Sequence, residues 1–115
     1  MTATVAHPRQ AGDGFDTASA TWKAGDQPGL SRLPLHSVPS GEMVALERLE
    51  PSTVLSEANC PGGEEIFILS GDLHDAQGHY GQGTWIRNPP QFRRALGSSR
   101  GATYWVKRGH LDPKP

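Results

Sequence analysis

Residues 55–71, LSEANCPGGEEIFILSG, carry the clearest structural pattern in the sequence. A Pro-Gly-Gly turn at 61–63 is followed by two glutamates and then by the apolar run IFIL at 66–69. β-branched and aromatic residues bounded by glycine are typical of a short strand. Val54 and Leu55, before the turn, indicate a second strand that leads into it. This stretch therefore predicts two β-strands connected through the Pro-Gly-Gly turn.

The neighbouring segments repeat this pattern of short strands and turns. Residues 64–80 indicate a hairpin pair that includes a separate short strand at 72–75. The segment GTWIRNPP at 83–90 is a glycine-led strand ended by prolines, which cannot donate to a ladder. A loop is expected at 97–101, and ATYWVK at 102–107 is a strand with strong β propensity. About eight strands at short, regular spacing predict an all-β sandwich or barrel of the jelly-roll type.

The strand expected at 43–49, MVALERL, has two mixed faces. Alternation places Val44, Leu46 and Arg48 on one face. The other face then holds Met43, Ala45, Glu47 and Leu49. Because neither face is purely apolar, we expect one charged side chain to lie inside the fold or at its rim. The pair Tyr104 and Trp105 also alternates, so one ring should line the barrel and the other should pack outside.

Length and composition exclude several classes of protein. A chain of 115 residues corresponds to one domain, and the formal net charge of -1 gives no electrostatic basis for binding nucleic acid. The sequence has no apolar run near the roughly 20 residues that span a membrane. The lone Cys60 cannot form an intramolecular disulfide and suits a reducing compartment. We therefore expect a cytoplasmic protein without a membrane or nucleic-acid partner.

The domain boundaries follow from changes in composition. Residues 1–19 are polar and weakly periodic, which predicts a flexible N-terminal arm; a strand that swaps onto a partner subunit is the alternative. Residues 20–108 form the expected domain. Residues 109–115 are expected to be a C-terminal tail.

The two central motifs resemble those of the cupin superfamily. Glu64 and Gly71 are separated by six residues, as in the first cupin motif, and Cys60 precedes Glu64 by four positions. The string PGGEEIFILSGDLHDAQGHYGQGTWIRNPP is most similar to the ChrR-type cupins, the C-terminal domains of a class of bacterial anti-sigma factors that also occur alone. The resemblance runs from about Trp22 to Lys107 and implies a double-stranded β-helix, the cupin jelly-roll barrel. In that family a separate helical, zinc-binding domain binds the sigma factor, and this sequence lacks the Cys/His pattern for it.

The resemblance also implies a metal site, which this sequence has largely lost. Metal-binding cupins use two His one residue apart, a Glu and a third His; in ChrR-type cupins the metal is zinc. These positions fall on Ala58, Cys60, Glu64 and Arg94. Ala58 cannot ligate, and the guanidinium of Arg94 has no lone pair and repels a cation. We expect Glu64 and Arg94 to form a charge pair where the cation would sit.

We therefore expect no bound metal. Zinc or another divalent cation, held by Cys60 and Glu64, is the alternative. A histidine at 36, 74 or 79 could join such a site, but no metal spacing links these residues to Cys60. Cys60 can equally be a small buried apolar residue.

These features predict a small-ligand-binding cupin of the sensor or carrier type. The expected ligand pocket contains Cys60, Glu64, Arg94, Arg48 and Tyr104. Two further interpretations stay open: a cupin enzyme (a dioxygenase, isomerase or lyase) with an unusual site around Cys60 and Glu64, and a family member that serves only oligomer assembly. We expect a homodimer, because a small isolated sandwich leaves sheet edges and apolar surface exposed.

Overall fold

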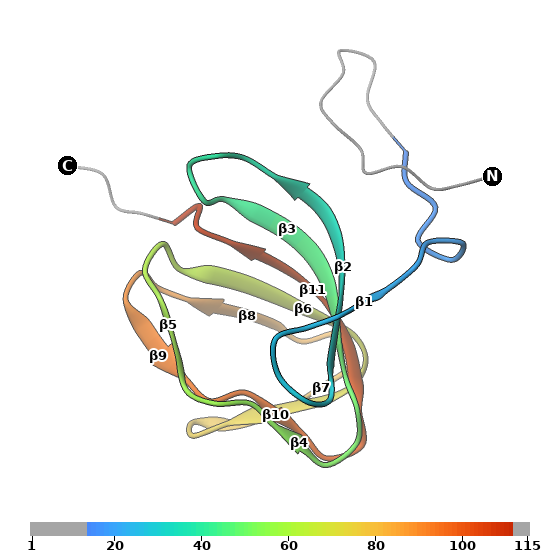
Figure 1. The fold of residues 1–115 in the computed structure, drawn as a ribbon. Helices are drawn as coiled ribbons and strands as arrows, with labels where there is room; N and C mark the ends of the chain where they lie inside the picture. Colours follow the sequence, from blue (N-terminus) through green and yellow to red (C-terminus); the bar gives the residue numbers. More distant parts are fainter. Residues whose placement is uncertain (1–13, 112–115) are drawn as a thin grey trace.

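The computed structural model describes residues 14–111, and within this range β-strands are the only regular secondary structure (Figure 1). The eleven strands are β1 (Lys23–Ala24), β2 (Leu30–Ser37), β3 (Met43–Leu49), β4 (Thr53–Val54), β5 (Ala58–Cys60), β6 (Glu64–Asp75), β7 (Gly78–Gly81), β8 (Trp85–Asn88), β9 (Phe92–Arg94), β10 (Gly97–Ser98) and β11 (Ala102–Arg108). The described residues contain no helix that could cross a lipid bilayer. The all-β prediction is confirmed.

One curled antiparallel sheet holds nine of these strands. Its order is β1-β2-β3-β11-β6-β10-β4, and β7 and β8 also pair with β6. The remaining strands, β5 and β9, form a separate two-stranded sheet. Figure 1 shows this small sheet facing the hollow of the large one. Residues of β2 and β3 on one side and of β5 and β9 on the other line a cavity.

The long strand β6 organises the large sheet. Its twelve residues pair with β11 and β8 at one end and with β7 and β10 at the other. Gly71 lies at the transition, with φ +82, where a side chain would run into the carbonyl oxygen of Gly101. The pairing with β11 shifts register nearby, between Thr103 and Tyr104. A glycine is needed here because the two backbones approach too closely for a Cβ atom.

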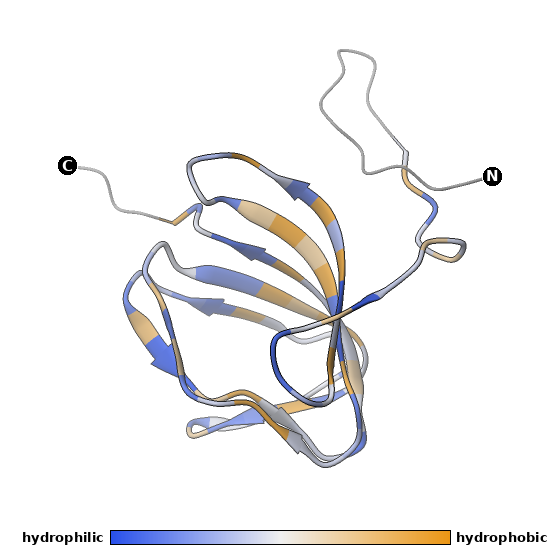
Figure 2. Ribbon diagram, viewed as in Figure 1, coloured by the Kyte–Doolittle hydropathy of each residue, from blue (hydrophilic) through white to orange (hydrophobic). Residues whose placement is uncertain are grey.

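The core lies on the inner face of β3, β6 and β11. Alternate residues point inward and are nearly inaccessible to solvent: Ala45, Leu49, Ile66, Ile68, Tyr104 and Val106. The expected alternation of Tyr104 and Trp105 is confirmed, since Tyr104 is buried and Trp105 is half-buried. Figure 2 shows hydrophobic residues along much of β3 and in the middle of β6 and β11, and hydrophilic residues at the ends of β6, β8 and β11 that lie toward β5 and β9.

Several strand predictions were wrong in detail. The sequence suggested about eight strands, but residues 72–75 continue β6, and Gly97–Ser98, expected in a loop, pairs with both β4 and β6. Strands β9 and β10 have only three and two residues, which is too short for a periodic pattern. They form because their backbones pair with those of neighbouring strands, β9 with β5 and β10 with β4 and β6.

The two ends of the chain are only partly described. Of the predicted arm at 1–19, residues 1–13 lie outside the described range, as do residues 112–115 of the predicted tail. The first tail residues run along the Pro-Gly-Gly turn, since Gly109 N donates to Gly63 O (3.0 Å) and Leu111 N to Gly62 O (2.8 Å). Backbone hydrogen bonds to this turn therefore continue beyond residue 108, the end of β11.

Candidate functional site

A cavity of about 660 Å³ opens between the large sheet and the β5–β9 pair. Apolar side chains form part of its wall: Leu30, Met43, Leu55, Ala58 and Cys60. Charged side chains form another part: Asp26, Arg32, Glu47, Arg94 and Arg108. This size and mixture are typical of a small-molecule site.

Glu64 and Arg94 form the ion pair that the sequence predicted. Arg94 Nε donates to Glu64 Oε2 (2.7 Å) and Arg94 Nη2 donates to Glu64 Oε1 (3.0 Å), so the contact is bidentate. Glu64 is 0% exposed and Arg94 7%. Strand β6 supplies Glu64, directly after the Pro-Gly-Gly turn, and β9 supplies Arg94, in the segment that follows the proline pair. Asn88 Nδ2 gives Glu64 a further hydrogen bond (2.7 Å).

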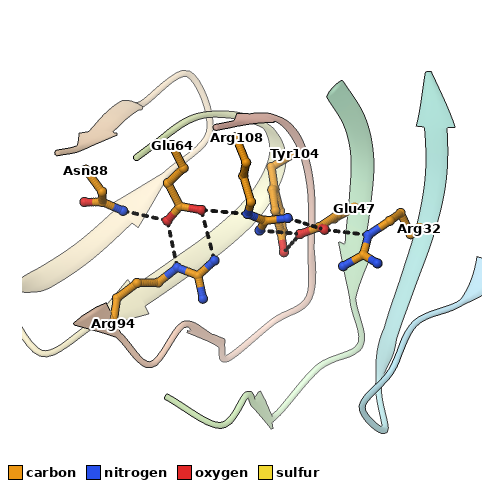
Figure 3. A network of polar contacts seen from close by, with 7 residues as sticks. All are labelled: Arg32, Glu47, Glu64, Asn88, Arg94, Tyr104 and Arg108. Atoms are coloured by element: carbon orange, nitrogen blue, oxygen red, sulfur yellow. Dashed lines mark hydrogen bonds and ion pairs between the residues drawn. The ribbon is translucent and has the colours of Figure 1, made fainter. Parts of the chain in front are cut away.

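The pair is one end of a longer chain of charges, here called the Arg-Glu ladder: Arg94, Glu64, Arg108, Glu47 and Arg32 (Figure 3). Arg108 bridges its two acids, with Nε on Glu64 (3.0 Å) and both Nη atoms on Glu47 (2.9 and 3.1 Å). Arg32 Nε reaches Glu47 at 2.8 Å. The ladder crosses β9, β6, β11, β3 and β2 and so ties the small sheet to the far side of the large one.

The ladder keeps both acids ionised. Burial alone would raise the pKa of Glu64, but hydrogen bonds and charge from Arg94 outweigh it and hold that pKa at about 2. Burial likewise opposes ionisation of Glu47, and Arg108 with Arg32 brings its pKa to about 2. The same attraction raises the pKa of Arg108 despite its burial. Buried charges are tolerated here because each acid has several donors.

Cys60 lies in the cavity wall. Its residue is buried, and burial together with the charge of Glu64 raises its pKa. A nucleophilic or metal-binding cysteine needs the thiolate, which a raised pKa disfavours.

The residues at the four family ligand positions do not fit a metal ion. Ala58 lies opposite Arg94 in the β5–β9 pairing, and the guanidinium of Arg94 already neutralises Glu64. No group of three His, Cys, Asp or Glu in residues 14–111 is placed to hold a metal. Structural and catalytic zinc sites usually have three or more protein ligands. The three histidines considered above, His36, His74 and His79, are not in the cavity wall.

Arg48 corrects one prediction about the pocket. The structure places this residue on the outer face of β3, exposed, where its guanidinium stacks 4.0 Å from the ring centre of Trp22 and its Nε donates to Thr103 Oγ1 (3.3 Å). The charged residue of β3 that points inward is Glu47, because the face with Ala45 and Leu49 is the one that meets the core. Tyr104 does point inward, but it is not among the residues that line the cavity, and its hydroxyl donates a hydrogen bond to Glu47 (2.9 Å).

Sequence reasoning missed three members of the ladder: Arg32, Glu47 and Arg108. The mixed face of residues 43–49 was the available signal for Glu47. Arg108 lies one residue beyond the strand expected at 102–107, and Arg32 lies in a segment with little periodicity. Their meeting depends on the register between β2, β3 and β11, which pairs Arg32 with Glu47 and Glu47 with Tyr104.

Residues 10–112 match the ChrR cupin-like domain family. The chain belongs to that family. No curated protein matches the sequence significantly. The family assignment agrees with the resemblance seen in the GGEE and RNPP segments.

Solved structures confirm the cupin fold of this family member. The anti-sigma ChrR, in the complex with SigE from Rhodobacter sphaeroides, has a TM-score of 0.70 and 13% identity over 81% of this chain and 51% of that one. An RmlC-like cupin from Ralstonia eutropha JMP134 has a TM-score of 0.73 and 12% identity, over 81% of this chain and 65% of that one. The polyketide cyclase RemF from Streptomyces resistomycificus gives 0.71 and 14%, over 85% and 80%. The chain thus spans less than two thirds of the first two proteins, and at these identities the likeness concerns the fold alone.

Proposed function

We propose that this cupin domain binds a small molecule without a metal ion, as a sensor or carrier module. The observation that carries the proposal is the Arg-Glu ladder beside the cavity. Arg94 stands at a family ligand position and pairs with Glu64, while the adjoining space of about 660 Å³ remains open. A charged, pre-organised wall next to apolar side chains is suited to ligand binding.

The catalytic alternative around Cys60 and Glu64 has less support. A general base needs a free lone pair and a pKa near the working pH. Glu64 already accepts hydrogen bonds on both oxygens, and its pKa of about 2 makes it a poor base. The raised pKa of Cys60 argues against a nucleophilic role.

We keep the cytoplasm as the expected compartment, because the single cysteine is free and buried.

Elemental analysis of the protein, purified without chelators, tests independence from metal. We expect far less than one zinc, iron or manganese ion per chain. The triple variant Ala58→His/Cys60→His/Arg94→His, which supplies the family's ligand types, is the positive control and should gain metal. About one metal per wild-type chain, lost in Glu64→Ala, would overturn the proposal.

A thermal-shift screen of small metabolites tests ligand binding directly. A ligand that binds only the folded state raises the melting temperature, and the stabilisation grows with the logarithm of its concentration over Kd. We expect stabilisation of the wild type by at least one compound class. Arg48→Gln, which changes a charge on the outer face, should respond to the same compounds and serves as the matched control.

We also propose that the chain is a homodimer. Support comes from an apolar row on the outer face of the large sheet, here called the outer stripe: Trp105, Phe67, Leu69 and Trp85. Trp85 is 56% exposed, Phe67 40% and Leu69 43%, so much of this apolar surface is in contact with water. Contiguous exposed apolar surface of this kind marks interaction sites.

A further inference from the structure

The guanidinium groups of the Arg-Glu ladder differ in how many of their nitrogens donate hydrogen bonds to the glutamates. Arg108, in the middle, directs Nε, Nη1 and Nη2 to carboxylate oxygens. Arg94, at one end, gives Glu64 only Nε and Nη2. Figure 3 shows the remaining nitrogen of Arg94 pointing away from Glu64. One edge of this guanidinium, formed by Nη1 and Nη2, is therefore free of Glu64.

This free edge of Arg94 has access to the cavity. Among residues 14–111, Arg94 Nη1 has no hydrogen-bond partner. In the same range, His110 Nδ1 is the one side-chain polar atom that is fully buried and has no partner, so Arg94 Nη1 is not fully buried. Arg94 is a cavity-lining residue, although its side chain is only 5% exposed. A nearly buried donor that faces a cavity is poorly hydrated and gains much from an acceptor in the cavity.

The charge of the ladder favours an anionic acceptor. Its three arginines and two ionised glutamates leave one positive charge in excess (3 − 2 = +1). Asp26 also belongs to the cavity wall, but it is exposed and has no ion pair with the ladder in the described residues. The excess charge is shared along the ladder, and no further acid of the described residues pairs with either of its ends, Arg94 and Arg32.

The rest of the wall selects the body of the ligand. Leu30 and Leu55 are buried core residues that also face the cavity, and Met43, at the opposite end of the β2–β3 pair from Leu30, contributes apolar surface elsewhere in its wall. A free inorganic anion would contact Arg94 but would leave this apolar surface wet. An organic acid satisfies both parts of the site.

We infer that the ligand is a small organic acid whose carboxylate binds the free Nη1–Nη2 edge of Arg94 and whose apolar body packs against Leu30 and Leu55. The inference rests on the proposed function and specifies the ligand class. A carboxylate matches the two parallel N–H groups of a guanidinium edge, whereas a neutral amide can accept through one oxygen only.

Isothermal titration calorimetry of the full chain with matched probes tests this assignment. The probes are benzoate and hexanoate, their amides benzamide and hexanamide, and inorganic phosphate. We expect each carboxylate to bind roughly tenfold or more tightly than its amide, the usual range for a charge-assisted hydrogen bond. Phosphate should bind more weakly than the carboxylates, because it cannot use the apolar wall.

Two conservative variants separate the free edge from general charge effects. Arg94→Lys keeps a cation next to Glu64 but removes the second guanidinium edge, so carboxylate affinity should fall on the order of tenfold. Arg93→Lys changes the neighbouring residue, whose side chain pairs with Glu57 at the surface and is absent from the cavity wall, and should keep wild-type affinity. In the wild type, carboxylates should also shift the NMR signal of the Arg94 Nε–H, which does not depend on any variant folding.

The outcomes distinguish the two proposals. Equal binding of acids and amides, or an unchanged affinity in a folded Arg94→Lys, would overturn the organic-acid assignment and leave a small-molecule site in place. Preferential binding of phosphate would overturn it as well, because it would indicate a site for inorganic anions. If no probe binds and the metabolite screen also fails, the proposed function itself is wrong.

Discussion

At the scale of single residues, Glu64 and Arg94 are buried charges that depend on each other. Glu64→Gln should lower the free energy of unfolding by about 3–5 kcal/mol, because it leaves the buried guanidinium of Arg94 without its counter-charge. Arg94→Met should also destabilise, and the double variant should lose clearly less than the sum of the two. Urea unfolding of all four proteins measures the coupling. Purely additive losses would mean that the two residues do not interact in solution.

The neighbouring pair Glu57 and Arg93 provides a matched control, since Arg93 lies in β9 and Glu57 directly precedes β5. Their side chains lie 3.3 Å apart and each is 58% exposed. Glu57→Gln should change the free energy of unfolding by no more than about 1 kcal/mol, because water solvates both charges. A large effect here would indicate that the loss in Glu64→Gln reflects damage to the sheet.

The glutamates of the ladder also make stability depend on pH. The pKa values of Glu47 and Glu64 are lowered from 4.5 to about 2, so folding favours their ionised forms. This stabilisation is complete above about pH 4.5 and is lost as the pH falls toward 2. Urea midpoints should therefore drop steeply below pH 4.5. Glu47→Gln should flatten that drop, whereas Glu50→Gln, at an exposed position, should leave it unchanged.

The sequence predicted one ion pair of the site but not the ladder. Position 94 and Glu64 were found because they belong to motifs with fixed spacing. Glu47 was missed in favour of Arg48, because the two faces of residues 43–49 carry similar apolar content and only the packing of Ala45 and Leu49 decides which face is inner. Arg108 was missed because its partners come from two other strands, and no local pattern records that register.

At the scale of elements, the close approach of β6 to the backbone that leads into β11 requires glycine at position 71. Gly71→Ala would combine a strained φ of +82 with a collision against the backbone of Gly101. That backbone cannot move freely, since Gly101 O accepts a hydrogen bond from Asp72 N (3.1 Å). We expect a loss of unfolding free energy well above the roughly 1–2 kcal/mol that positive φ alone costs, and thermal or urea melting measures it.

Two other glycines separate the causes of that loss. Gly83→Ala also has a positive φ (+86) but meets open space, so it should show the backbone strain alone. Gly81→Ala has neither strain nor contact and should be close to neutral. Equal losses in Gly71→Ala and Gly83→Ala would contradict the proposed collision.

The elements that the sequence predicted are those with enough residues to show a period. The strands at 43–49 and 102–107 and the hairpin after Glu64 are all present. Strands β5, β9 and β10 have two or three residues each and carry no such pattern. They form by pairing with partners distant in sequence, as Ala58 does with Arg94, and such tertiary effects are not visible locally.

At the scale of the whole molecule, the outer stripe shows how two copies could meet. Register places Trp105, Phe67 and Trp85 side by side across β11, β6 and β8. On one side of this apolar row lie three charged residues in register, Lys107, Glu65 and Arg87. On the other side lie the polar residues Thr103 and Ser70. An apolar band between polar rows is complementary to itself, which a two-fold symmetric interface requires.

The stripe predicts a dimer that depends on Trp85. Light scattering should give a dimer mass for the wild type at micromolar concentration. Trp85→Ser should shift the equilibrium toward monomer, because this ring is 56% exposed in the single chain and would become buried between the copies. Val54→Ser is the matched control, since Val54 is 69% exposed on β4, away from the stripe, and the variant should remain dimeric. A monomeric wild type would rule out the homodimer, and a dimeric Trp85→Ser would place the interface elsewhere.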